Sequence, residues 1–268
     1  MADDATPPML AVHQLEVVYH KVATAIQGVT LEVPRGAIVA VVGTNGAGKT
    51  TTLRAVSGFL PSEDVEITDG TIAYKGERIE GRAPHELSRR GLVLVPERNK
   101  VFETLTVEDN LLFNLPMRER GGQALQQVYA YFPRLAERRA QVAGYLSGGE
   151  KQMLAIGMAL LCRPELLLID ELSLGLAPVI IESLMATLER MNRELGLTIL
   201  LVEQNAMAAL AVSSYGYVME GGRVVYKGTA AELLSHHDIQ EFYLGGAGAE
   251  LKSYREVKQY RRKRRWWG

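Results

Sequence analysis

The stretch from residue 37 to residue 53 constrains the fold of this chain more than any other segment. It begins with an unbroken apolar run at residues 37–42, and such a run suits a β-strand buried on both faces. The pattern Gly-x-x-x-x-Gly-Lys-Thr follows at residues 43–50. A glycine-rich loop between a strand and a helix can turn several backbone N–H groups toward one anion. The sequence therefore predicts a phosphate-binding loop that consists of Gly43, Thr44, Asn45, Gly46, Ala47, Gly48, Lys49, Thr50 and Thr51.

Two side chains of this loop add chemistry to the backbone. Lys49 supplies a positive charge for the β- and γ-phosphates of a nucleotide, and Thr50 offers a hydroxyl oxygen to Mg²⁺. The helix that begins here also points its positive dipole end at the phosphates. The alternative is a glycine-rich turn that binds nothing, but the complete pattern in its strand-loop-helix context favours a nucleotide site.

Composition limits the classes of protein to which the chain can belong. The 268 residues suffice for one large domain or two small ones, and a hydrophobic content of 47% is ordinary for a globular core. No apolar run reaches the roughly 18 residues of a membrane span, and the first residues lack the features of a secretion signal. We therefore expect a cytosolic protein. Cys162 is the only cysteine, which excludes an intramolecular disulfide, and we expect it to be buried on a helix.

The order of apolar runs and turns predicts an α/β fold with a mixed sheet. Short apolar runs at residues 10–20 and 28–33 predict an antiparallel hairpin ahead of the phosphate loop, in an N-terminal antiparallel β subdomain. Several later strands end in polar residues, such as Glu203 and Gln204 after residues 197–202, and these ends should meet at one edge of the sheet. The later strands that we expect lie at residues 70–74, 91–95, 166–169 and 197–202, with a hairpin at 218–226 that turns at Gly221 and Gly222.

Helical periodicity predicts an inserted α-helical subdomain between two of these strands. It covers residues 106–143, where Thr106 is the expected N-cap, and continues in a long helix after residue 147. Further helices are expected at residues 49–59, 84–90 and 178–194, with two short ones within 229–244.

Acidic residues follow two of the buried strands. Asp170 and Glu171 come directly after an apolar run, and burying unpaired charge costs several kcal/mol, so a metal ion and a reacting water are their natural partners. We expect Asp170 to hold Mg²⁺ and Glu171 to face the attacking water. Glu97 ends another strand at the edge where ligands bind, and a solvated loop acid remains the alternative for it.

Two further features suit a nucleotide. Ser147, Gly148, Gly149 and Glu150 open a long helix whose first N–H groups could bind phosphate, which suggests a second nucleotide contact. Tyr19 stands at the end of a strand, where its ring could stack on a purine or could simply be half-buried.

The C-terminal tail differs in charge from the rest of the chain. From residue 250 onward, eight Lys or Arg residues stand against two Glu, a net charge of +6 that leaves −7 for the remainder, so we expect no binding of nucleic acid by the folded part. A glycine-rich hinge at residues 245–248 precedes this tail. Its basic residues and two tryptophans suit an anionic membrane surface; a solvated tail, or an arm docked on the acidic body or a partner, remains the alternative.

Together these motifs resemble the ATP-binding subunits of ABC transporters over about residues 9–245. The segment Leu146-Ser147-Gly148-Gly149-Glu150, about twenty residues before Asp170 and Glu171, is characteristic of that family. The resemblance implies a P-loop NTPase core with a helical insertion at about residues 98–160, followed by the hinge and tail at 246–268. It also implies ATP and Mg²⁺ as ligands and a peripheral location at the cytoplasmic face of the plasma (inner) membrane. The implied partners are a sibling ATPase subunit in a homo- or heterodimer, transmembrane permease subunits and, indirectly, a solute-binding protein.

The resemblance also implies roles for single residues. Tyr19 matches the adenine-stacking aromatic residue, and Glu171 matches the catalytic glutamate, which would act with Lys49 and Gln204. Glu97, an expected Mg²⁺ ligand beside Thr50 and Asp170, stands where the family usually has glutamine. Gln204 stands where the family usually has histidine, and its neutral amide can orient the γ-phosphate without supplying positive charge.

Three segments narrow the resemblance to importers of branched-chain amino acids. These segments are residues 95–97, 174–178 and 202–206. The ATPase of a lipid- or polysaccharide-extracting transporter and a non-transport ABC protein that acts on ribosomes or DNA are the alternatives. The sequence of an ATPase subunit does not identify the transported solute, because this subunit does not contact it. Branched-chain amino acids are the usual solutes of the importers that this chain resembles.

Overall fold

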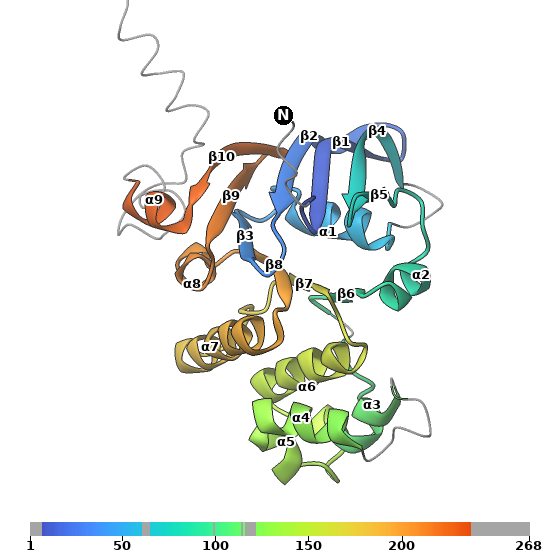
Figure 1. Cartoon of the computed structure of the whole chain (residues 1–268), viewed down its shortest axis with the longest axis vertical. Coiled ribbons are helices and arrows are strands. Elements are labelled where there is room, and N and C mark those ends of the chain that lie inside the picture. Colours follow the sequence, from blue (N-terminus) through green and yellow to red (C-terminus); the bar gives the residue numbers. More distant parts are fainter. Residues whose placement is uncertain (1–6, 61–64, 99, 114, 116–121, 237–268) are drawn as a thin grey trace, which may run out of the picture.

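The computed structural model describes residues 7–60, 65–98, 100–113, 115 and 122–236 (Figure 1). Its centre is a six-stranded sheet with the order β10-β9-β3-β8-β7-β6, in which β10 alone runs antiparallel to its neighbour. The α/β fold with a mixed sheet is confirmed. The strands of this sheet are β3 Ile38–Gly43, β6 Leu92–Val95, β7 Leu166–Asp170, β8 Thr198–Glu203, β9 Tyr215–Glu220 and β10 Arg223–Thr229.

A second, antiparallel sheet has the order β2-β1-β4-β5, as the predicted N-terminal subdomain requires. Its strands are β1 Leu10–Tyr19, β2 Ala23–Val33, β4 Val65–Tyr74 and β5 Glu77–Arg78. The strands β2 and β4 each begin five residues earlier than predicted. Backbone pairing with the end of β1 extends them there, through residues that are exposed or partly buried apart from Ile26 and that show no clear apolar pattern.

Alternate residues of β3 face two different cores. Val39 and Val41 pack with the antiparallel sheet and with α1 Lys49–Ser57. Ala40 and Val42 pack in the other core, which includes residues of α6, α7 and α8. This two-sided burial is the reason why the strand reads as an unbroken apolar run. Four helices contribute residues to the core that contains Ala40 and Val42: α6 Gly148–Leu161, α7 Pro178–Leu195, α8 Ala206–Ala211 and α9 Ala230–Ser235.

The predicted helical insertion forms a lobe at the opposite end of the molecule from the antiparallel sheet (Figure 1). Thr106 caps its first helix, since Oγ1 accepts a hydrogen bond from the backbone N of Asp109 at 3.0 Å. Asn110 is fully buried and fixes the preceding loop through Phe102, whose N donates to Oδ1 at 2.7 Å. The helices of the insertion that precede α6 are α3 Val107–Phe113, α4 Gln123–Tyr131, α5 Pro133–Glu137 and the 3₁₀ helix η2 Ala143–Tyr145.

Several expectations need correction or lie outside the described residues. The short helices α5 and α8 were not expected, whereas α2 Pro84–Arg89 was. Cys162 is half-buried at the C-cap of α6 rather than buried within a helix. The second of the two helices expected within residues 229–244 lies largely beyond residue 236, outside the described residues. The predicted hinge and tail lie wholly beyond it.

In the part of the chain that the structure describes, no helix combines the length and apolar character that crossing a bilayer requires.

Candidate functional site

The loop between β3 and α1 contains glycines with positive φ angles, as its sequence pattern predicts. Gly46 and Gly48 have φ angles of +78° and +96°, a region that disfavours residues with a Cβ. At Gly48 an added Cβ would also lie 2.6 Å from Cγ2 of Ile26, so close packing against β2 requires glycine. The helix α1 therefore begins directly behind the loop, with Lys49 as its first residue.

The side chain of Lys49 is 3% exposed, and its ammonium group is surrounded by oxygen. Nζ donates hydrogen bonds to the carbonyl oxygens of Gly43 at 2.9 Å and Thr44 at 3.1 Å. It also lies 3.3 Å from Oε1 of Glu171. A buried cation needs such partners, because an uncompensated charge in the interior costs several kcal/mol. The ion pair thus joins the phosphate loop to the residue that follows β7.

The two acidic residues after β7 lie close to this loop but have different surroundings. Asp170 is 4% exposed, and its Oδ1 accepts a hydrogen bond from Oγ1 of Thr50 at 3.0 Å. Burial raises the pKa of the Asp170 carboxyl to about 6, against the lowering effect of the Thr50 hydrogen bond. Glu171 has a φ angle of +47°, which is unusual for a residue with a side chain, and its N donates to the carbonyl of Val202 at 2.9 Å.

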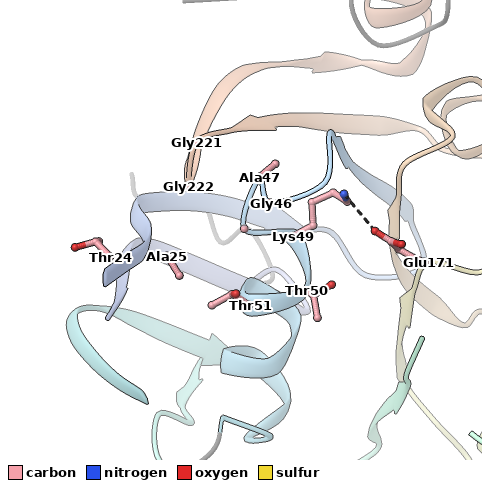
Figure 2. Close-up of a pocket in the computed structure, with 11 residues that line it drawn as sticks. Thr24, Ala25, Gly46, Ala47, Lys49, Thr50, Thr51, Glu171, Gly221 and Gly222 are labelled. Carbon is pink, nitrogen blue, oxygen red and sulfur yellow. Dashed lines mark ion pairs between the residues drawn. The ribbon is translucent and has the colours of Figure 1, made fainter. Parts of the chain in front are cut away.

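A cavity of about 370 Å³ lies over the phosphate loop, and Figure 2 shows Lys49 reaching from the loop toward Glu171 at its edge. Sequence reasoning missed four of its lining residues, Thr24, Ala25, Gly221 and Gly222. The turn at Gly221 and Gly222 was predicted, but nothing in the local sequence indicates that it lies beside the loop. The residues that line the cavity are Thr24, Ala25, Gly46, Ala47, Gly48, Lys49, Thr50, Thr51, Glu171, Gly221 and Gly222.

Gly222 supports the loop through its backbone, and this contact predicts the effect of a substitution. Its N donates to the carbonyl of Ala47 at 3.1 Å, its φ is +76°, and an added Cβ would lie 2.6 Å from the carbonyl oxygen of Ala25. We expect Gly222→Ala to lower the free energy of unfolding by about 1–3 kcal/mol and to weaken nucleotide binding, because the hairpin must shift away from the loop.

The matched control is Gly196→Ala, at a φ of +65° with no atom within 4 Å of the added Cβ. It imposes a similar backbone strain without a clash. Thermal unfolding should therefore show a smaller loss of stability than in Gly222→Ala, and nucleotide titration should show the affinity of the wild type. Equal nucleotide affinity in the Gly222→Ala variant and the wild type would contradict a supporting role for this turn.

Three other predicted site residues, Tyr19, Gln204 and Glu97, do not line the phosphate cavity. The hydroxyl of Tyr19 is 3.5 Å from Oγ1 of Thr51. Gln204 shares a neighbouring cavity of about 270 Å³ with Glu171. Glu97 does not line the phosphate cavity: together with Asp170 it lines a third one, of about 540 Å³, and its Oε1 lies 2.9 Å from Nε of Arg98.

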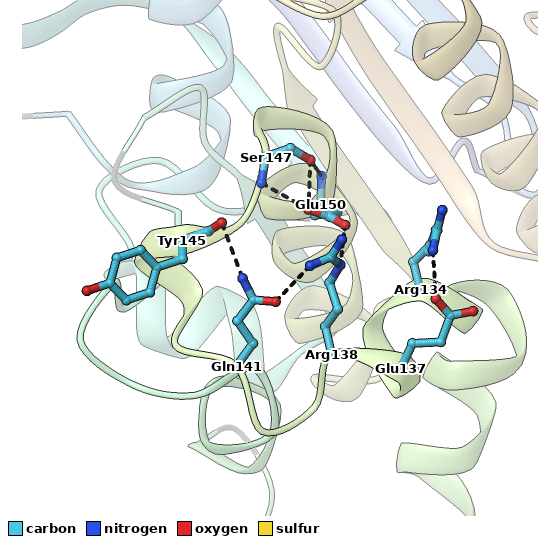
Figure 3. A network of polar contacts seen from close by, with 7 residues as sticks. All are labelled: Arg134, Glu137, Arg138, Gln141, Tyr145, Ser147 and Glu150. Atoms are coloured by element: carbon cyan, nitrogen blue, oxygen red, sulfur yellow. Dashed lines mark hydrogen bonds and ion pairs between the residues drawn. The ribbon is translucent and has the colours of Figure 1, made fainter.

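The start of α6 forms a separate polar cluster (Figure 3). Ser147 donates from N and Oγ to Oε2 of Glu150, at 2.9 and 2.8 Å, and its Oγ accepts from the N of Glu150 at 3.4 Å. Nε of Arg138 lies 2.6 Å from Oε1 of Glu150. Burial acts to raise the pKa of this carboxyl, but the hydrogen bonds from Ser147 and the charge of Arg138 lower it overall. This helix start and the phosphate loop do not line a common cavity among those described.

Comparison with known proteins places these features in one family. The ABC transporter family matches residues 26–173 of the chain. The high-affinity branched-chain amino acid transport ATP-binding protein BraG of Pseudomonas aeruginosa is 42% identical over 240 residues, which cover 89% of this chain and all of that protein. The probable branched-chain amino acid transport ATP-binding protein LivF of Archaeoglobus fulgidus is 35% identical over 81% of this chain and 91% of its own length.

The fold agrees with this relationship. A solved structure of the ATP-binding subunit of an ABC transporter superposes with a TM-score of 0.71 at 29% identity, and covers 88% of this chain and 96% of its own. The chain therefore belongs to the ABC transporter family, as one of its ATP-binding and ATP-hydrolysing subunits.

Proposed function

We propose that this subunit powers the import of branched-chain amino acids, or of related small solutes, across the plasma membrane. The observation that carries the proposal is the 42% identity to BraG over the whole length of that protein, whose name states branched-chain amino acid transport. The second relative, LivF, carries the same transport function in its name. We place the subunit at the cytoplasmic face of the membrane, bound to permease subunits that receive solute from a solute-binding protein.

In this proposal the phosphates of ATP bind in the cavity above the loop at residues 43–51. Backbone N–H groups of the loop bind the phosphates, and the ammonium group of Lys49 exchanges part of its present oxygen contacts for phosphate oxygens. Thr50 and Asp170 would hold Mg²⁺, which takes few protein ligands and leaves its other positions to phosphate and water. Mg²⁺ neutralises charge that develops on the phosphate oxygens when it is bound. Glu97 remains the third predicted ligand, since it shares a cavity with Asp170.

Glu171 is the proposed base that orients the attacking water. Support comes from its position at the edge of the phosphate cavity and from its ion pair with Lys49, which keeps the carboxylate near the site. Gln204, in the adjoining cavity, would orient the γ-phosphate through its amide. Tyr19 is the proposed stacking partner of the adenine.

The proposal includes a second ATPase subunit, either a sibling or another copy of this chain. ATP would lie between the phosphate loop of one subunit and the helix start at Ser147, Gly148 and Gly149 of the other, next to Glu150. Support for a contact with a facing subunit comes from the described cavities, since none of them is lined by both this helix start and the phosphate loop of the same chain. Closure around ATP and reopening after loss of the γ-phosphate would then move the helical lobe against the permeases.

Uptake in cells of the source organism tests the proposed function. Deleting the gene should abolish high-affinity uptake of radiolabelled leucine, and a wild-type copy should restore it. A copy that carries Lys49→Ala should not restore uptake, because ATP binding would be weaker and the phosphates would lack the cation that positions them for cleavage. Unchanged uptake of leucine, isoleucine and valine in the deletion strain would contradict the proposed substrate class, and the same assay with other amino acids would then identify the solute.

A further inference from the structure

Glu203, the last residue of β8, is a buried carboxylate that the proposed mechanism does not use. Its side chain is fully buried. Burying an ionised carboxylate costs several kcal/mol unless hydrogen bonds or charges compensate it. The compensation comes from the turn after β7: the N of Ser173 donates to Oε1 at 2.9 Å, and Oγ of Ser173 donates to Oε2 at 2.5 Å. The backbone of Leu172 adds a weaker stabilising hydrogen bond.

This turn also contains Glu171, and β8 holds it at two successive points. The N of Glu171 donates to the carbonyl of Val202, and Ser173 donates to the side chain of the next residue of β8, Glu203. Glu171 itself has a φ angle of +47°. Left-handed backbone at a residue with a Cβ costs about 1–3 kcal/mol and persists only where surrounding contacts impose it. The hydrogen bond from Glu171 to Val202 and those from Ser173 to Glu203 hold the backbone at this strained residue and two residues after it.

We propose that Glu203 is a positioning residue for ATP hydrolysis: by holding Ser173, its carboxylate fixes the turn that keeps Glu171 aimed at Lys49 and the phosphate cavity. The inference rests on the proposed role of Glu171. A carboxylate suits this task because both of its oxygens accept, one from the backbone N and one from the hydroxyl of Ser173. An amide would keep both contacts only if the hydroxyl turned to accept, and that N–H···O contact would be longer than the present 2.5 Å, so the turn would have to shift. Burial raises the pKa of Glu203 to about 7, and the hydrogen bonds from Ser173 oppose that rise, which agrees with a group whose burial needs compensation.

Two substitutions and one matched control test the proposal in the full chain, assembled with its partner subunits. We expect Glu203→Gln to lower kcat for ATP hydrolysis by about tenfold or more, with KM for ATP changed less than about twofold, because the misaligned group acts in the chemical step rather than in binding. Ser173→Ala should lower kcat in the same direction by less, since the backbone donor remains. The double variant should be no slower than Glu203→Gln, because both changes remove one shared contact.

The control is Thr198→Val. Thr198 is fully buried on the same strand, and its Oγ1 accepts a hydrogen bond from Gly36 at 2.9 Å, far from the turn in question. It should lower thermal stability while leaving kcat within about twofold of the wild type. If Glu203→Gln does not fold, Ser173→Ala alone carries the test.

Wild-type kcat in both Glu203→Gln and Ser173→Ala, with only a loss of stability like that of the control, would overturn the inference. A parallel assay of Glu171→Gln separates this failure from failure of the proposed mechanism. If Glu171→Gln also hydrolyses ATP at the wild-type rate, the role given to Glu171 is wrong. If Glu171→Gln is inactive and Glu203→Gln is fully active, only the positioning role of Glu203 is wrong.

Discussion

Glu171→Gln should lower the rate of ATP hydrolysis by at least about 100-fold while ATP binding is retained, because an amide cannot accept the proton of the attacking water. The substitution also removes the negative partner 3.3 Å from Nζ of Lys49, which leaves the ammonium group more available to phosphate. ATP should therefore stay bound and trap the subunit in its closed dimer. The measurement is steady-state hydrolysis beside equilibrium binding of a fluorescent ATP analogue.

The exposed acid Glu189 on α7 provides the control, since Glu189→Gln removes the same charge away from the cavity. It should leave both hydrolysis and binding unchanged. Hydrolysis by the Glu171→Gln protein at the wild-type rate would show that another group activates the water.

Lys49→Ala should weaken ATP binding by about 10- to 100-fold, because a hydrogen bond that involves a charged group contributes about 1.5–3 kcal/mol. The substitution also leaves Glu171 without its cationic partner beside the phosphates, so repulsion adds to the loss. The binding assay with the fluorescent ATP analogue measures this effect directly.

Lys75→Ala is the appropriate control, since Lys75 pairs with Glu165 at 2.5 Å outside the phosphate cavity. Its affinity for ATP should equal that of the wild type. If Lys49→Ala binds ATP as tightly as Lys75→Ala, the phosphates do not occupy the cavity above the loop.

The fold could be predicted where burial leaves a pattern in the sequence. The strand β3 lies between two cores, so its apolar run predicted the strand, and the glycine pattern at residues 43–50 predicted the loop after it. The early part of β2 could not be predicted, because backbone pairing with β1 defines it and Ile26 is its single buried residue. The helix α8 was missed because its six residues are too few for a periodic pattern, and because it lacks the proline that marks the first turn of the equally short α2.

The candidate site divides in the same way. Residues joined by one motif, such as Lys49 and Thr50, could be named from sequence, and the structure brings both close to Asp170 or Glu171. Gly222 could not, because its hydrogen bond to Ala47 joins segments distant in sequence. Glu203 was read only as the polar end of a strand, since its burial depends on how the turn at Ser173 folds back. The catalytic and ligand-binding roles themselves remain predictions.

The central claim is that this chain supplies half of an ATP site and that a second subunit completes it. A structure of the Glu171→Gln protein in complex with its partner subunits, ATP and Mg²⁺ tests the claim most directly. We predict that each triphosphate contacts the phosphate loop of one subunit and the serine-glycine helix start of the facing subunit, with Lys49 and Ser147 as the contacts that this chain supplies. ATP bound at the loop with that helix start turned toward solvent, or ATP bound elsewhere on the chain, would contradict the account.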